Sequence, residues 1–102
     1  KMIIYSVTCS IEPSIEEEWL LWMQEEHIPE VIQTNLFLKH TFCEVLTEAS
    51  GNDNRTFNIQ YELENMGLLH LYNTKFAPTL KQKTIAKYGD KCVAFRTILR
   101  KV

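Results

Sequence analysis

Apolar and polar residues alternate along two segments of the chain, residues 2–11 and residues 56–64. A period of two places successive side chains on opposite faces of an extended strand, so each segment is predicted to be a β-strand with one buried face. The residues that share this apolar face are Ile3, Tyr5, Val7, Cys9 and Ile11 in the first segment and Phe57, Ile59, Tyr61 and Leu63 in the second.

A helical pattern follows the first strand, with apolar residues at Ile15, Trp19, Leu20, Trp22 and Met23. Ser14 and Glu17 have the spacing of a capping box, which predicts that the helix begins at Ser14. The helix is expected to break at Ile28–Pro29, because proline has no N–H for the preceding turn and disfavours the α conformation of the residue before it. A second short helical turn is expected after the break.

The remaining segments complete an alternating order of strands and helices. Residues 36–48 are predicted to form a strand, joined through the turn-forming residues 50–54 to the strand at 56–64 as a hairpin. Asn65 is a plausible N-cap for a helix that Ala77–Pro78 interrupts and that ends at Gly89. Residues 92–102 are predicted to be the last strand.

The order βαββαβ predicts one α+β domain over residues 1–102. Two right-handed βαβ units interleaved in a four-stranded antiparallel sheet give the ferredoxin-like fold, with both helices on one face. The two halves repeat the same plan, since each has a helix interrupted by proline, at Pro29 and at Pro78. A doubly wound parallel sheet is disfavoured by the tight hairpin around Gly51.

The sheet is expected to leave its second face open. Phe95 and Leu99 are assigned to the helix side of the last strand, and Ala94, Arg96 and Ile98 to the open side. An open face that is half apolar predicts a homodimer formed through it. The residues expected at this dimer interface are Ile4, Ser6, Asn58, Gln60, Arg96 and Ile98. Arg96 is expected to pair with Glu62 across the interface; the alternative is an anionic ligand.

Composition narrows the class of protein. The chain has 102 residues, 45% of them apolar, and a net charge of −2, which is typical of a globular domain. Its three cysteines are far apart, so neither a disulfide framework nor a zinc site is expected, and a cytoplasmic location is the natural interpretation. No apolar stretch approaches the roughly 20 residues that span a bilayer, so no membrane association is expected.

His27 is the strongest candidate for chemistry. It lies beside the proline break, and an imidazole is the usual proton-transfer group near neutral pH. The alternative is a helix-end histidine that binds a freed carbonyl. Trp19 and Trp22 lie on one helical face, either as core or as the wall of a pocket. The predicted ligand site consists of Tyr5, Trp22, His27 and Tyr61, and neither a metal nor a cofactor is expected because no motif for one is present.

Three motifs are spread along the chain: Met2-Ile3-Ile4-Tyr5-x-Val7-Thr8, Glu18-Trp19-Leu20-x-Trp22-Met23-x-Glu25-Glu26-His27-Ile28-Pro29, and Gly89-Asp90-Lys91-x-Val93-Ala94-Phe95-Arg96-Thr97. Together they resemble a family of short bacterial proteins known as domain of unknown function 4286. Trp22 and residues 27–29 also resemble the pattern that ends the first helix in the dimeric α+β barrel superfamily, which includes cofactor-free oxygenases, isomerases and ligand-binding regulators. The resemblance implies a dimeric barrel with a pocket near His27, and it implies no activity.

Two functions remain open at this point. The favoured one is a dimeric ligand-binding or regulatory module for a small molecule, with an aromatic pocket between the first helix and the sheet. The alternative is a cofactor-free oxygenase-like or isomerase-like enzyme that uses His27 and Tyr5. Nucleic-acid binding is disfavoured, because the net charge is negative and the aromatic residues are assigned to the helix side of the sheet.

Overall fold

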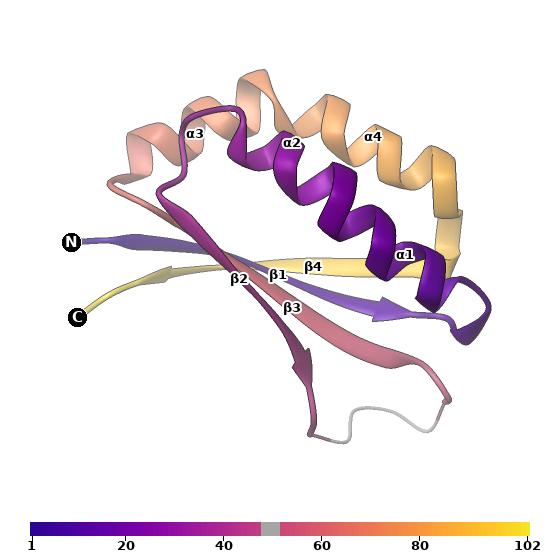
Figure 1. Ribbon diagram of the computed structural model, residues 1–102. Coiled ribbons are helices and arrows are strands. Elements are labelled where there is room, and N and C mark those ends of the chain that lie inside the picture. The colour runs from indigo at the N-terminus through magenta and orange to yellow at the C-terminus, as the bar shows by residue number, and fades with distance from the viewer. Residues whose placement is uncertain (48–51) are drawn as a thin grey trace.

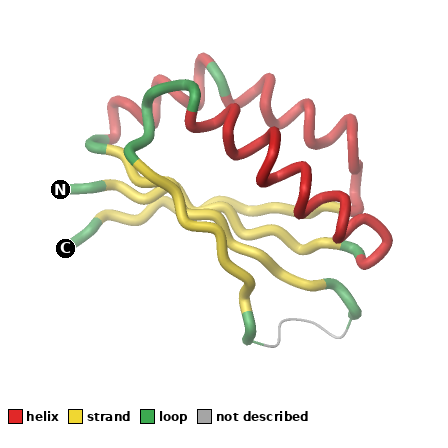
Figure 2. The backbone as a smooth tube through the Cα atoms, viewed as in Figure 1, coloured by secondary structure: helices red, strands yellow, loops and turns green. Residues whose placement is uncertain are grey.

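The computed structural model describes residues 1–47 and 52–102, which form a sheet covered on one face by helices (Figure 1). The strands are β1 (Ile3–Ile11), β2 (Lys39–Val45), β3 (Arg55–Leu63) and β4 (Cys92–Arg100). All neighbours are antiparallel, in the order β2-β3-β1-β4. This is the predicted ferredoxin-like α+β fold, and Figure 2 shows both helical segments on the same side of the sheet.

The first helical segment consists of a 3-10 turn (Pro13–Ile15), α1 (Glu16–Trp22), a π-helical turn (Met23–His27) and α2 (Ile28–Ile32). The second consists of α3 (Met66–Lys75), α4 (Ala77–Tyr88) and a 3-10 turn (Gly89–Lys91). Within the described residues, no helix is long and apolar enough to cross a membrane. Of the predicted turn at 50–54, Ser50 and Gly51 lie outside the described residues, as does Glu48 at the predicted end of the second strand.

The period-two pattern of the two central strands correctly predicted the core. Their apolar faces pack beneath the helices, and Trp19 of α1 is fully buried against them. Trp19 contacts Phe57 and Phe42 from the sheet, with ring centroids 5.3 and 5.8 Å apart. Asn65 caps α3 as predicted, since its side chain accepts a hydrogen bond from the Leu68 N–H at 2.9 Å.

The predicted break at Ile28–Pro29 is wrong. Ile28 keeps helical angles, φ −60° and ψ −45°, and the helix continues through Pro29. The π-helical turn explains this continuity, because the Ile28 N–H donates to the Met23 carbonyl, five residues back. Such a turn widens the helix by one residue, which relieves the clash that proline creates in a regular α-helix.

The predicted capping box is also wrong. The helix proper begins at Glu16, after a 3-10 turn in which Pro13 occupies the first position. Ser14 therefore lies inside the turn, and its hydroxyl donates to the Glu12 carboxylate at 2.9 Å instead of capping the backbone. Proline is pre-organised for the first turn of a helix, so the chain enters the turn before Ser14.

The face assignment of the last strand is inverted. Tyr5 pairs with Ile98 and Val7 pairs with Arg96 across the β1–β4 ladder. Residues directly opposite in an antiparallel pair share a face, so Arg96 and Ile98 lie on the helix side. Val93, Phe95 and Leu99 lie on the open side instead, with 58%, 62% and 40% of their surface exposed. Both faces of this strand carry apolar residues, so its pattern alone could not determine the register.

Candidate functional site

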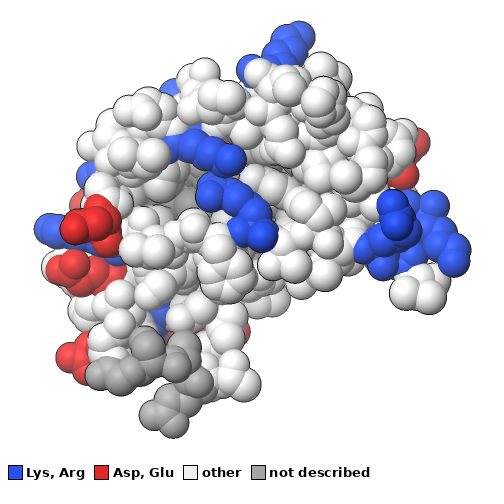
Figure 3. Space-filling model, turned by 180° about the vertical axis from the view of Figure 1, so that it is seen from behind, with Lys and Arg blue, Asp and Glu red and all other residues white. Residues whose placement is uncertain are grey.

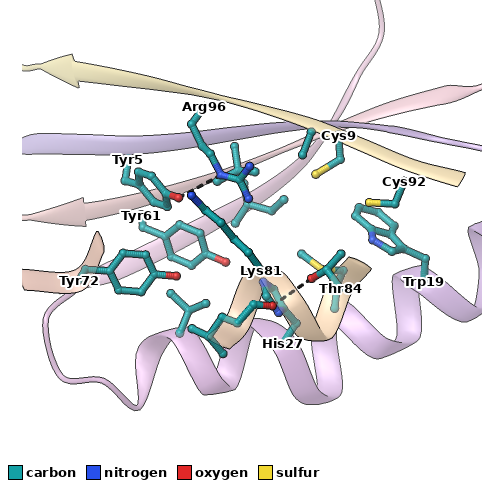
Figure 4. A pocket seen from close by; sticks show the side chains of 16 residues that line it. Tyr5, Cys9, Trp19, His27, Tyr61, Tyr72, Lys81, Thr84, Cys92 and Arg96 are labelled. Carbon is teal, nitrogen blue, oxygen red and sulfur yellow. Dashed lines mark hydrogen bonds between the residues drawn. The ribbon is translucent and has the colours of Figure 1, made fainter. Parts of the chain in front are cut away.

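A small cavity lies between the helices and the sheet, towards the β4 side of the molecule (Figure 4). Its volume is about 50 Å³. Tyr5 and Tyr61 contribute from the sheet, and Tyr72 of α3 adds a third phenol. His27 is the last residue of the π-helical turn and directly precedes α2. Its side chain lines the cavity opposite α4. Residues of α4 form the opposite side.

The cavity brings together three of the four residues predicted as the ligand site. Tyr5, His27 and Tyr61 line it, whereas Trp22 does not. The Trp22 indole instead stacks on the His27 ring, with centroids 4.9 Å apart and planes 27° apart, and it meets Tyr88 edge-on at 5.5 Å. Trp22 therefore supports His27 from behind and fixes the orientation of the imidazole.

Two cations lie at the mouth of the cavity, Arg96 of β4 and Lys81 of α4. The Arg96 Nε–H donates to the Tyr5 hydroxyl at 3.1 Å. In the described parts of the chain, neither cation forms an ion pair with a carboxylate. Burial, together with the Arg96 charge, lowers the pKa of Lys81. Seen from behind, basic side chains gather around a hollow in this face of the molecule (Figure 3).

The expected partner of Arg96 is engaged elsewhere. The Glu62 carboxylate pairs with Lys39 at 3.3 Å and with Lys101 at 2.9 Å, and it lies on the open face opposite Ile4. Because Arg96 points to the helix side, Glu62 of the same chain is on the opposite face of the sheet from it. The guanidinium is therefore directed at the cavity rather than at the predicted dimer interface.

His27 is held neutral at physiological pH. Burial lowers its pKa to about 4; the Glu30 charge opposes this shift, and the Arg96 and Lys83 charges add to it. Its Nδ1 atom is buried and has no hydrogen-bond partner among the described residues. A neutral imidazole with a free ring nitrogen beside a cavity can donate or accept one hydrogen bond, or accept a proton.

The phenols of the cavity are also neutral. Burial raises the pKa of Tyr61 and the pKa of Tyr72 above the ordinary range of tyrosine. Both hydroxyls are thus available as hydrogen-bond donors over the whole physiological pH range. Among the described residues, no three His, Cys, Asp or Glu side chains are grouped in a way that holds a metal ion.

Several cavity residues escaped the sequence analysis. Tyr72 occurs on the apolar face of α3, a signal that predicts core as readily as a binding site. Lys81 is one of three lysines in α4, and nothing in its sequence context distinguishes it from Lys83 or Lys87. Cys9 and Cys92 also line the cavity, although each was interpreted as a small hydrophobic residue.

The sequence profile of one family matches residues 2–102 of the chain. The chain belongs to the DUF4286 family, a domain of unknown function. The resemblance drawn from the three sequence motifs is thereby confirmed. No curated protein matches the chain.

Several proteins of known structure share the fold of this chain at low sequence identity. An ethyl tert-butyl ether d (EthD) family protein from Bacillus halodurans has a TM-score of 0.72 at 9% identity, covering 98% of this chain and 99% of that one. A dimeric ferredoxin-like protein of unknown function from Thermobifida fusca has a TM-score of 0.55 at 18% identity, with 96% and 92% coverage. A putative antibiotic biosynthesis monooxygenase from Bacillus cereus has a TM-score of 0.57 at 10% identity, with 99% and 95% coverage. At these identities the likeness establishes the fold alone.

Proposed function

We propose that this DUF4286 protein binds a small organic anion in the cavity between its helices and its sheet. The observation that carries the proposal is the pair of cations at the mouth, Arg96 and Lys81, which face the cavity and have no carboxylate partner in residues 1–47 and 52–102. An anion between them would make charge-assisted hydrogen bonds to both, and these are the strongest hydrogen bonds in proteins.

The electrostatics of the mouth support this assignment. Arg96 and Lys81 repel one another, which is one reason why the pKa of Lys81 is lowered. A bound anion would remove this repulsion and restore the charged form of Lys81. Further inside, the neutral hydroxyls of Tyr61 and Tyr72 and the His27 Nδ1 atom offer hydrogen bonds to polar atoms of the same ligand.

The size of the cavity limits the ligand. A volume of about 50 Å³ accommodates a carboxylate with a short chain, since an engineered cavity that takes benzene is about three times larger. A ring-bearing ligand would need Lys81 and Arg96 to swing outward. Both side chains are long and exposed, so this movement costs little.

We also propose that the protein is a homodimer formed through the open face of the sheet, with Ile4, Ser6, Asn58 and Gln60 at the interface. Val93, Phe95 and Leu99 extend the same face, and their exposure supports a covered surface in the assembled protein. The ferredoxin-like protein from Thermobifida fusca is dimeric, which supports a dimeric state for this chain. Arg96 and Ile98 are excluded from this interface because they lie on the opposite face.

A catalytic role for His27 is the second candidate function. The specific observation that favours it is a neutral imidazole that lines the cavity and whose Nδ1 atom has no hydrogen-bond partner in the described part of the chain. Such a group can take a proton from an acidic C–H or O–H of a bound molecule, while the Arg96 charge stabilises the anion that forms. This reaction needs no cofactor.

The binding proposal is tested with matched ligands and matched variants. Thermal unfolding is followed with propionate and benzoate and with the neutral isosteres propionamide and benzamide. The carboxylates should raise the melting temperature, because a ligand that binds only the folded state stabilises it. Arg96→Gln should raise the dissociation constants of both carboxylates about tenfold, which is the typical effect of losing one charge-assisted hydrogen bond. Arg100→Gln, on the same strand and face, is the control. Equal effects of acids and amides would refute the proposal.

A further inference from the structure

Two cysteines lie together at the inner end of the cavity. Cys92 is the first residue of β4 and pairs with Ile11, while Cys9 of β1 pairs with Ala94. The two cysteines are therefore diagonal neighbours on the helix side of the sheet. Figure 4 shows their sulfur atoms close to one another and beside the Trp19 indole. Cys9 is buried, whereas Cys92 is only partly buried.

The surroundings of Cys92 favour its thiolate. The Cys9 thiol can donate a hydrogen bond to the Cys92 sulfur, which lowers the pKa of Cys92; burial opposes this, and the nearby Trp19 N–H and the Arg96 charge lower the pKa further. The same contact, together with burial, raises the pKa of Cys9, which keeps its proton. The Trp19 indole is fully buried, and among the described residues its N–H has no hydrogen-bond partner.

We propose that Cys92 is a modification site that reacts with small, negatively charged disulfides. Its thiolate attacks one sulfur of the disulfide R–S–S–R and forms the mixed disulfide Cys92–S–S–R. The S–S bond of the reagent breaks, and the other half leaves as the thiolate R–S⁻. The Cys92 sulfur is oxidised, the departing sulfur is reduced, and the proton of the Cys92 thiol has already passed to solvent.

A mixed disulfide is favoured over an internal Cys9–Cys92 bond for a geometric reason. Diagonal neighbours on antiparallel strands have Cα atoms about 7–8 Å apart, whereas disulfides normally need less than about 6.8 Å. The internal bond would therefore require the strands to shift. Cys9 acts instead as the proton-holding neighbour of the reactive sulfur.

The preference for anionic reagents comes from the two cations at the mouth of the cavity, which also carry the binding proposal. Arg96 and Lys81 line the cavity together with Cys92, so a negatively charged reagent is attracted to the sulfur and a positively charged one is repelled. The modification does not require the protein to have an organic acid as its ligand. The modification of Cys92 is thus an additional property of this cavity. An adduct on Cys92 would also occupy the space that a ligand needs.

Methanethiosulfonate reagents test the proposal, because the Cys92 thiolate attacks their R–S sulfur to form the same mixed disulfide and releases methanesulfinate. The two reagents share this leaving group and differ in whether R carries a sulfonate or a trimethylammonium group. The reduced chain is treated with each reagent, and the adduct on each cysteine is followed by mass spectrometry of peptides. We expect Cys92 to react about tenfold faster with the anionic reagent than with the cationic one, in line with charge focusing in a cleft. Cys43 lies on the open face of the sheet, away from both cations, and pairs with Asn58 of the proposed dimer interface, so its rate ratio and not its absolute rate serves as the internal control; that ratio should be smaller.

Two variants make the result specific. Arg96→Gln should lower the anion-to-cation rate ratio at Cys92 and leave that at Cys43 unchanged. Cys9→Ala should slow the reaction of Cys92 with both reagents, since the hydrogen-bonding neighbour is gone. Equal rates of the two reagents at Cys92, or labelling of Cys92 only in denaturant, would overturn the proposal. Because no carboxylate ligand is present, selective labelling would stand even if propionate and benzoate failed to bind.

Discussion

The buried state of His27 predicts how the stability of the protein changes with pH. The ordinary pKa of histidine is 6.5, and burial lowers that of His27 to about 4 in the folded protein. Between these values the unfolded chain binds a proton at His27 that the folded protein does not. The free energy of unfolding therefore rises with pH across this window, and the contribution is lost as the pH falls from 6.5 towards 4.

The magnitude follows from the size of the shift. A shift of one pKa unit corresponds to about 1.4 kcal/mol. The titration of His27 should therefore lower the free energy of unfolding of the wild-type protein by about 2 kcal/mol between pH 7 and pH 5. This is an upper value, because the ring is partly exposed and water reaches it. Glu44 and Glu62, whose pKa values are lowered by Arg55 and by Lys101, add their own loss at lower pH.

The assay is urea denaturation at several pH values between 5 and 7, followed by the fluorescence of the two tryptophans. Between pH 5 and pH 7 the free energy of unfolding of His27→Gln should change by about 2 kcal/mol less than that of the wild type, because glutamine does not titrate. This difference is expected whatever the absolute stability of the variant. His70→Gln, at an exposed position of α3, is the matched control and should leave the slope unchanged. Parallel pH profiles for wild type and His27→Gln would refute the account of His27 as a buried neutral histidine.

Three further predictions concern the fold and the assembly. Asn65→Ala should destabilise the protein by about 1 kcal/mol in urea, because the N-cap of α3 is lost, and Asn65→Asp should retain most of that stability. Gly89→Ala should cost about 1 kcal/mol although its added Cβ meets no atom, since φ is +57° there; an unchanged midpoint would contradict this. Phe95→Glu should convert a sedimenting dimer into a monomer, whereas Ile85→Glu, equally exposed on α4, should not; a wild-type monomer would contradict the dimer.

The fold was predictable because its central strands, β1 and β3, are each apolar on one face only. That pattern assigns the core and, with the hairpin and the two helical segments, the βαββαβ order. The last strand was not predictable in the same way. Val93, Phe95 and Leu99 are more apolar than Ala94 and Arg96 on the other face, so the pattern favoured the wrong face, and only the pairing of Tyr5 with Ile98 identifies the face that lies towards the helices.

The candidate site was predictable in part for a related reason. Tyr5 and Tyr61 lie on faces that the periodicity identifies, His27 was indicated by the neighbouring Pro29, and the structure places all three around one cavity. The partners of Arg96 depend on strand register and could not be read from the pattern. The course of the chain at Pro29 depends on a π-helical turn, which proline accommodates but does not by itself predict.

The side chain of Arg96 offers the most direct measurement of the central claim, that the cavity holds an organic anion. Its Nε–H gives a resolved signal in ¹H–¹⁵N spectra when it is hydrogen-bonded, as it is to Tyr5. Titration with propionate should shift this signal and the Trp19 indole signal along one saturable curve, while propionamide at the same concentrations should leave both in place. No shift of the Arg96 signal with propionate, or an equal shift with propionamide, would contradict the account.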